Sequence, residues 1–188
     1  LSRLPVGRVM RHILPWAGDT TPNMPRVAIY AVVDAPFGPL HVMTTHLEYS
    51  SSLLRAAEVE GLRQIHRLAS ERMVRPSSKY YGPFTPVSET PSCVLMGDFN
   101  MKPDDPIKAH IEAPFGDDIP RLRDAWTLKN GATPHPPSFC IHDQRYGQPH
   151  CCDFIFVSED IAPRVTAIDY DVVTQISDHQ PVLLTLAD

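Results

Sequence analysis

The chain lacks several features that would place a protein in a class at once. It has no apolar run near the ~20 residues that cross a bilayer, no Cys-x-x-Cys pair and no internal repeat. It also lacks an excess of basic residues, with 17 Lys and Arg against 22 Asp and Glu and a net charge of -5. Because general nucleic-acid binding depends on neutralising phosphates, this balance disfavours a bulk DNA or RNA binder, while leaving room for a locally basic cleft.

What is present is typical of one globular domain. The chain has 188 residues, of which 43% are hydrophobic, so we expect a single domain over residues 1–188 with a sizeable core. Its four cysteines are scattered through the sequence and match no zinc or disulfide framework. They indicate reduced thiols and weakly favour a cytoplasmic location. These cysteines are Cys93, Cys140, Cys151 and Cys152.

The apolar pattern predicts a sheet-rich fold with one long helix. Two β-forming runs at 26–34 and 40–47 flank a Gly-containing turn at 36–39, which predicts a hairpin. A helix is expected to begin near Ser50–Ser52 and to continue through Glu71 or beyond. Proline-rich stretches at 76–91 and 131–137 predict loops. Further predicted elements are strands at 93–96, 154–157, 164–173 and 181–186 and a short helix at 105–112.

Polar residues follow or begin four of these apolar runs. They occur in the segments 44–48, 96–100, 152–155 and 176–182. Buried carboxylates and histidines need partners, because an unpaired buried charge is costly. If the strand ends converge, their side chains form one polar cluster on a rigid base, which suits a catalytic site.

The residue types in such a cluster suit hydrolysis of a phosphate ester. That reaction needs charge neutralisation, a base for the attacking water and donors for the developing oxyanion. Carboxylates without cysteine ligands favour a hard cation, Mg²⁺ or Mn²⁺. Taken singly, each residue also has a structural interpretation. His46 could be a hydrogen-bonded histidine of the core or its rim. The other four residues could cap turns or lie in loops, namely Asp98, Asn100, Asp153 and Asp178.

The ordered set of motifs is more specific than any one of them. Gly97-Asp98-Phe99-Asn100, Asp153-Phe154-Ile155-Phe156 and Ser177-Asp178-His179-Gln180-Pro181-Val182 resemble the closing motifs of the endonuclease/exonuclease/phosphatase family, which has the DNase I-like fold. Thr45-His46-Leu47 resembles the family's earlier histidine motif. The segments 1–6, 122–126 and 137–139 add to the resemblance, which therefore spans nearly the whole chain.

The resemblance implies a fold, a reaction and a set of roles. The fold would be an α/β (α+β) four-layered sandwich with two central, mostly antiparallel sheets. The function would be metal-dependent hydrolysis of a phosphodiester or phosphomonoester by an activated water, with Mg²⁺ (or Mn²⁺) as cofactor. The implied catalytic residues are His46, Asp98, Asn100, Asp153 and His179, and the implied metal ligands are Asp178, Asp98 and Asn100.

In the family pattern, Asp98 activates or orients water and Asn100 positions the scissile phosphate. His179, oriented by Asp153, stabilises the transition state. His46 contacts the phosphate or assists the leaving group, and Asp178 supports the metal directly or through water.

The chain departs from the family pattern at its start. Family members begin with a strand carrying an asparagine, followed by a Gln-Glu motif whose glutamate binds the metal, and these elements do not occur in the sequence. We therefore expect an N-terminally incomplete domain that binds metal poorly and exposes apolar surface or open sheet edges.

Two functional hypotheses follow from these observations. The first is an enzyme acting on a small or lipid-like phosphoester, with a DNA or RNA nuclease as the alternative substrate class that the net charge disfavours. The second is a non-catalytic binding or scaffold module of the same fold, which the missing glutamate allows. The retention of Asp98, Asn100, Asp153, Asp178 and His179 favours the enzyme.

Overall fold

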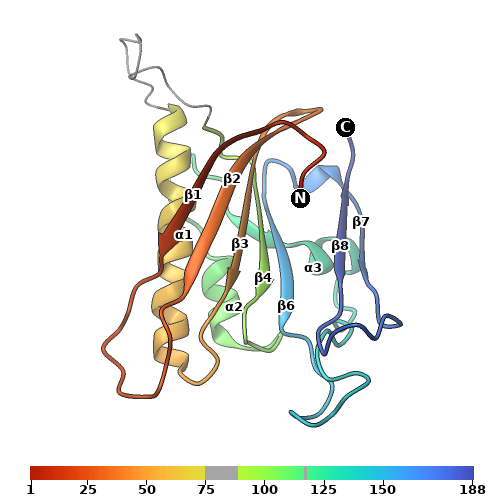
Figure 1. Cartoon of the computed structure of the whole chain (residues 1–188). Helices are drawn as coiled ribbons and strands as arrows, with labels where there is room; N and C mark the ends of the chain where they lie inside the picture. Colours follow the sequence, from red (N-terminus) through yellow and green to blue (C-terminus); the bar gives the residue numbers. More distant parts are fainter. Residues whose placement is uncertain (75–88, 117) are drawn as a thin grey trace.

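The computed structural model describes residues 1–74, 89–116 and 118–188. Two sheets and their helices form the fold (Figure 1). The larger sheet has six strands in the order β1-β2-β3-β4-β6-β5, and the smaller one pairs β7 with β8. Most of the predicted loop at 76–91 lies outside the described residues. The strands are β1 (Val6–Ile13), β2 (Val27–Ala35), β3 (Gly38–His46), β4 (Cys93–Asp98), β5 (Leu122–Asp124), β6 (Asp153–Ser158), β7 (Val165–Tyr170) and β8 (Val182–Leu186).

The predicted hairpin and long helix are confirmed. β2 and β3 pair antiparallel around the turn, and the helix that follows is α1 (Ser52–Val74). The Ser51 hydroxyl accepts a hydrogen bond from the Leu54 amide (3.2 Å), so Ser51 caps the first turn of α1. The remaining helices are α2 (Pro106–Ile111), α3 (Ala125–Asn130) and the short 3₁₀ helix η2 (Ala162–Arg164).

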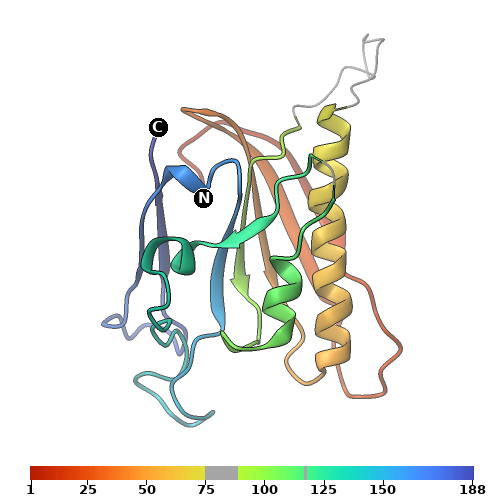
Figure 2. The same cartoon turned by 180° about the vertical axis from the view of Figure 1, so that it is seen from behind.

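Both faces of the large sheet are packed. Helices α1 and α2 cover one face, where Met43, Leu62 and Leu95 join a buried cluster (Figure 2). The other face packs on β7 and β8, where Ile155 and Ile168 join a second cluster. Every strand pairing is antiparallel except β3–β4. The predicted two-sheet α/β sandwich is thereby confirmed.

Apolar surface is exposed at the β1 side of the large sheet. Val9 is 58% exposed and Ile29 is 43% exposed, and Val9 lies beside Ala31 on the face opposite α1. β1 itself is an edge strand. Exposed apolar side chains and an open edge were both expected, and both are found here.

Four elements differ from the predictions. β1 was not predicted as a strand, and neither were β5 and the adjoining helix α3. β7 ends at Tyr170, whereas the alternating pattern predicted a strand to Val173. The Asp171 carboxylate accepts hydrogen bonds from the Val173 and Thr174 amides (both 3.0 Å), and this turn ends the strand.

Candidate active site

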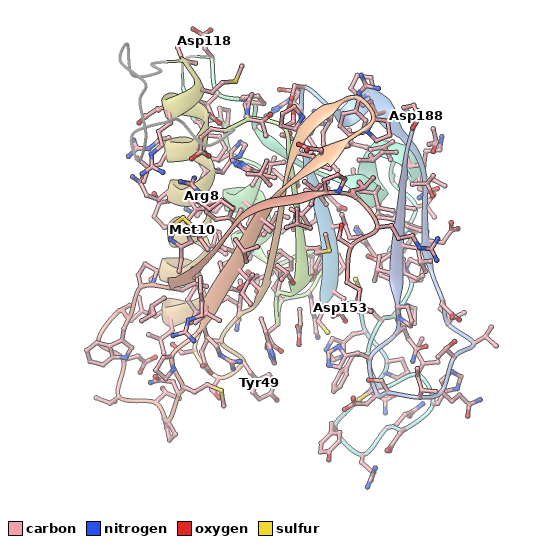
Figure 3. All side chains as sticks on the ribbon, turned by 45° about the horizontal axis from the view of Figure 1, so that its top comes forward. Arg8, Met10, Tyr49, Asp118, Asp153 and Asp188 are labelled. Atoms are coloured by element: carbon pink, nitrogen blue, oxygen red, sulfur yellow. The ribbon has the colours of Figure 1, made fainter. Side chains whose placement is uncertain are left out.

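The register of three neighbouring strands aligns three of the predicted site residues. β3 and β4 run parallel with His46 opposite Asp98, and β4 and β6 run antiparallel with Asp98 opposite Asp153. Neighbouring strands lie roughly 4.8 Å apart, so this register places all three residues at one edge of the sheet. Figure 3 labels Asp153 at this edge, where β6 begins, and Tyr49 at the same end of the molecule.

Gly97 permits this alignment. Its φ of 144° lies in the left-handed half of backbone space, and a Cβ there would be 1.9 Å from the Thr45 carbonyl oxygen. Only glycine lets β4 approach β3 so closely just before Asp98. The backbone therefore requires the glycine of the Gly97-Asp98-Phe99-Asn100 motif independently of any catalytic role.

Two imidazoles face the Asp98 carboxylate. Asp98 Oδ2 lies 3.5 Å from His46 Nε2 and 3.7 Å from His179 Nε2. Both distances exceed those of good hydrogen bonds, so this carboxylate oxygen can still accept a hydrogen bond from another group. The second oxygen, Oδ1, accepts from the Asn100 amide (2.8 Å) and fixes the carboxylate.

His179 is held by a short hydrogen bond to Asp153. Its Nδ1 lies 2.9 Å from Asp153 Oδ2, and the Phe139 ring packs 4.6 Å from the imidazole between ring centroids. The Ser138 hydroxyl donates to the same carboxylate oxygen (2.7 Å) and accepts from the Cys152 and Asp153 amides (3.1 and 3.0 Å). Ser138 thus orients Asp153, which orients His179.

Charge and burial shift two pKa values at this site. Hydrogen bonding to Asp153 raises the pKa of His179, and the Asp153 and Asp98 charges add to that rise against the effect of burial. Burial raises the pKa of Asp98, helped by the nearby Asp153 charge, although the Asn100 amide and both histidines oppose the rise. The arrangement favours a cationic His179 beside a carboxylate that readily accepts a proton.

Asn100 adopts a left-handed backbone conformation with a φ of 48°. One N–H of its side-chain amide donates to the Leu47 carbonyl (2.8 Å), which ties the residue to the segment after His46. This bond leaves the second amide N–H and the carbonyl oxygen for another partner. Asn100 therefore lies beside Asp98, as the sequence predicted.

Asp178 is not a member of the tight cluster of ligand atoms at this site, although its charge helps to raise the pKa of the adjoining His179. Four other side chains place one ligand atom each within 4.8 Å of one another, and Asp178 is not among them. Its backbone oxygen accepts from the Cys140 amide (3.1 Å), and its side chain lines a separate hollow. The four clustered residues are Asp98, Cys152, Asp153 and His179.

This donor set matches Mg²⁺ only in part. Only Asp98 and Asp153 supply the carboxylate oxygens that this ion prefers, whereas an octahedral Mg²⁺ needs six oxygen ligands. Burial raises the pKa of the Cys152 thiol far above its ordinary value, so Cys152 stays protonated at neutral pH. The described residues alone do not complete a magnesium site.

The sequence analysis missed Ser138 and Cys152 as neighbours of the site. Both are buried, and a hydroxyl or thiol in a loop has no periodic signal. Ser138 lies in a segment that contributed to the family resemblance without a role being assigned to it. The prediction of four free cysteines is confirmed, since all four are unpaired and buried.

The fold and this site together define a class of protein with acid–base and anion-binding groups at the strand ends of a two-sheet α/β sandwich. The sequence profile of the Endonuclease/Exonuclease/phosphatase family matches residues 10–179. The chain belongs to that family. A comparison with curated proteins finds no significant sequence match.

Solved structures share the fold at low sequence identity. The 3′ phosphatase NExo from Neisseria, bound to a product DNA hairpin, is 17% identical with a TM-score of 0.64, over 99% of this chain and 73% of that one. The human Nocturnin catalytic domain with bound sulfate is 17% identical (TM-score 0.58; 97% and 61%). A Bacteroides thetaiotaomicron mannosyl-6-phosphatase is 15% identical (TM-score 0.59; 98% and 67%). The chain thus spans roughly two thirds of the length of these structures, and as little as 61% of the Nocturnin domain.

None of the described helices combines the length and apolar character needed to cross a membrane.

Proposed function

We propose that the chain carries the catalytic groups of a phosphoester hydrolase that acts by attack of an activated water. The observation that carries this proposal is the convergence of His46, Asp98 and the Asp153–His179 pair at one sheet edge. Two imidazoles within 3.7 Å of one carboxylate oxygen provide both a proton acceptor and anion-stabilising donors. Membership of a family that contains phosphatases and nucleases supports this reaction class.

Each residue has a role that follows from its geometry. Asp98 accepts a proton from the attacking water, because both imidazoles lie beyond good hydrogen-bond distance of its Oδ2 and its pKa is raised. His179, held by Asp153, donates from Nε2 to a phosphate oxygen and stabilises the charge that develops there. Asn100 positions the phosphate through its free amide hydrogen, and His46 contacts the phosphate or the leaving group.

Dependence on Mg²⁺ or Mn²⁺ is part of the proposal. A bound divalent cation would supply charge neutralisation at the phosphate. Among the described residues, Asp98 is the carboxylate best placed to contribute to such a site. Because these residues supply only part of an octahedral oxygen donor set, we expect them to bind the ion weakly.

The substrate proposed is a small or lipid-like phosphoester. The net charge of -5 weighs against a general nuclease, although the similar Neisseria structure contains DNA. A cytoplasmic location is proposed on the strength of the four free thiols. The incomplete magnesium donor set favours one alternative, a non-catalytic module of the same fold.

Hydrolysis of bis-p-nitrophenyl phosphate and p-nitrophenyl phosphate tests the proposal. The chain is assayed with Mg²⁺, with Mn²⁺ and with a chelator. We expect metal-stimulated release of p-nitrophenol that Asp98→Asn lowers by roughly 10²–10⁴-fold. Absence of turnover of both substrates with either metal, or turnover that Asp98→Asn leaves unchanged, would favour the non-catalytic module.

A further inference from the structure

A hollow of about 450 Å³ lies beside the candidate active site. One wall is the segment 142–146, and the other is the segment 175–178 that leads directly into His179. Ligand pockets for small molecules commonly enclose roughly 300–1,000 Å³, so the hollow has room for a ring system. None of the roles proposed above uses it.

Short contacts connect the hollow to the catalytic histidine. The His179 amide donates to the Ser177 hydroxyl (3.1 Å), and the Cys140 amide donates to the Asp178 carbonyl (3.1 Å). The Phe139 ring, one residue before Cys140, packs on the imidazole. These contacts tie the wall at 175–178 to His179 and to the segment that precedes the other wall. The hollow therefore lies next in sequence to the catalytic histidine, and we infer that a group esterified to a phosphate at His179 extends into it.

The charges that line the hollow do not suit a second anion. Arg145 is its only Lys or Arg side chain, and the Asp143 carboxylate already holds that guanidinium through contacts of 2.6–3.0 Å. The Asp178 side chain adds a further negative charge. A phosphate or carboxylate group would therefore meet repulsion with no free cation to offset it.

Apolar surface is exposed on both walls instead. The Tyr146 side chain is 67% exposed on one wall, and Ile176 is 92% exposed on the other. A planar ring between them would bury apolar area and stack on the tyrosine, at the small entropy cost of ordering two side chains. The Asp178 carboxylate remains near the edge of such a ring.

We propose that the hollow between Tyr146 and Ile176 is a substrate subsite for the neutral planar ring of an aromatic phosphoester, either an aryl group or a nucleobase. The inference rests on the proposed function, because it places the phosphate of the same molecule at His179. It adds the class of organic group that the enzyme selects and the residues that select it.

The experiment compares three diesters that share a non-aromatic 2,2,2-trifluoroethyl leaving group, whose release is followed by ¹⁹F NMR. Their second groups are methyl, phenyl and thymidine-5′, and kcat/KM is measured for the chain, for Tyr146→Ala and for Ile176→Ala, with Lys129→Ala as a remote surface control. We expect the chain to prefer the ring-bearing esters over the methyl ester. Tyr146→Ala should reduce that preference roughly fivefold or more, as the loss of a ring-stacking contact does, Ile176→Ala should reduce it less, and both should leave the methyl ester unchanged.

Binding measurements test the subsite independently of the proposed hydrolysis. The affinities of phenyl phosphate, thymidine 5′-phosphate and methyl phosphate are measured by ligand-observed NMR. Tighter binding of either ring compound, lost in Tyr146→Ala, supports the subsite even if no diester is hydrolysed. Hydrolysis without a ring preference, or a preference that both variants retain, would overturn the subsite and leave the proposed reaction standing. Preference for phenyl alone or for thymidine alone identifies the source of the ring.

Discussion

Asp124 and Asp98 are two carboxylates with histidine neighbours, and they differ in how completely they are hydrogen-bonded. Asp124 is 1% exposed and its oxygens accept four short hydrogen bonds, of 2.7–3.0 Å. Asp98 has one short bond and two imidazoles at 3.5 and 3.7 Å. The four donors to Asp124 are His135, Lys108, the Thr127 hydroxyl and the Trp126 amide.

The pKa values of the two carboxyls move in opposite directions. Burial alone would raise the pKa of Asp124, but hydrogen bonds from His135 and Lys108 outweigh it and bring the pKa to about 2. For Asp98, burial and the Asp153 charge prevail, and the pKa rises. A saturated carboxylate stabilises the fold, whereas one with free capacity is available for chemistry.

Asp98→Asn should cause the largest loss of activity without a loss of stability. We expect hydrolysis to fall by roughly 10²–10⁴-fold, because the amide cannot accept the proton of the attacking water. The free energy of unfolding should stay the same or rise, since the substitution removes a buried charge beside Asp153. Single-turnover hydrolysis and urea unfolding measure the two effects. A clear loss of stability would show that Asp98 is structural.

Asp124→Ala should show the reverse. It leaves His135 without its carboxylate and Lys108 with Glu112 as its remaining partner, so the free energy of unfolding should fall by about 3 kcal/mol. Asp34→Ala, on the exposed side of β2, is the matched control and should change stability little. Equal effects of the two substitutions in urea unfolding would contradict the network.

The pH dependence of stability checks the same network. The depressed pKa of Asp124 stabilises the fold at pH values above the ordinary value of 3.8, and this contribution is lost as the pH falls toward about 2. The shift corresponds to roughly 2 kcal/mol. Unfolding curves between pH 6 and pH 2 should therefore lose this amount in the parent chain, and the Asp124→Ala variant should lack that component.

Gly97→Ala should disturb the alignment of the site strands. The new Cβ would overlap the Thr45 carbonyl, and the residue would hold a positive φ, so we expect a loss of more than about 2 kcal/mol. Gly38→Ala is the matched control, because Gly38 also has a positive φ of 119° but has open space around it. The difference between the two unfolding free energies isolates the β3–β4 contact, and a difference near zero would refute its role.

Ser138→Ala should have the smallest effect of the four substitutions. It removes the partner of two buried amides and one carboxylate oxygen, at a cost of about 1–2 kcal/mol in unfolding. It should also loosen His179 and lower kcat more than it raises KM. Ser92→Ala, which removes an exposed hydroxyl contact to Asp160, is the control. A change in stability without a change in kcat would limit Ser138 to a structural role.

The site residues that lie at strand ends could be predicted from the sequence. His46, Asp98 and Asp153 each mark a point where an apolar run meets polar residues, and the register brings them together. Sequence reasoning did not single out Asp124, whose partners Lys108 and His135 come from a helix and a loop distant in sequence. β1 carries Arg and His among its apolar positions, and β5 and α3 are too short for a periodic signal. The role in metal binding that the resemblance gave to Asp178 stays a prediction; the residue adjoins His179 and lines the hollow beside Tyr146.

Phosphate titration followed by histidine side-chain NMR tests the central claim most directly. Inorganic phosphate added to the chain should shift the imidazole signals of His46 and His179 together, with one shared affinity, and should leave His135 unchanged. Asp98→Asn should strengthen that binding, because it removes a negative charge that faces the anion. Separate affinities for His46 and His179, or no response from either imidazole, would contradict a shared phosphate site.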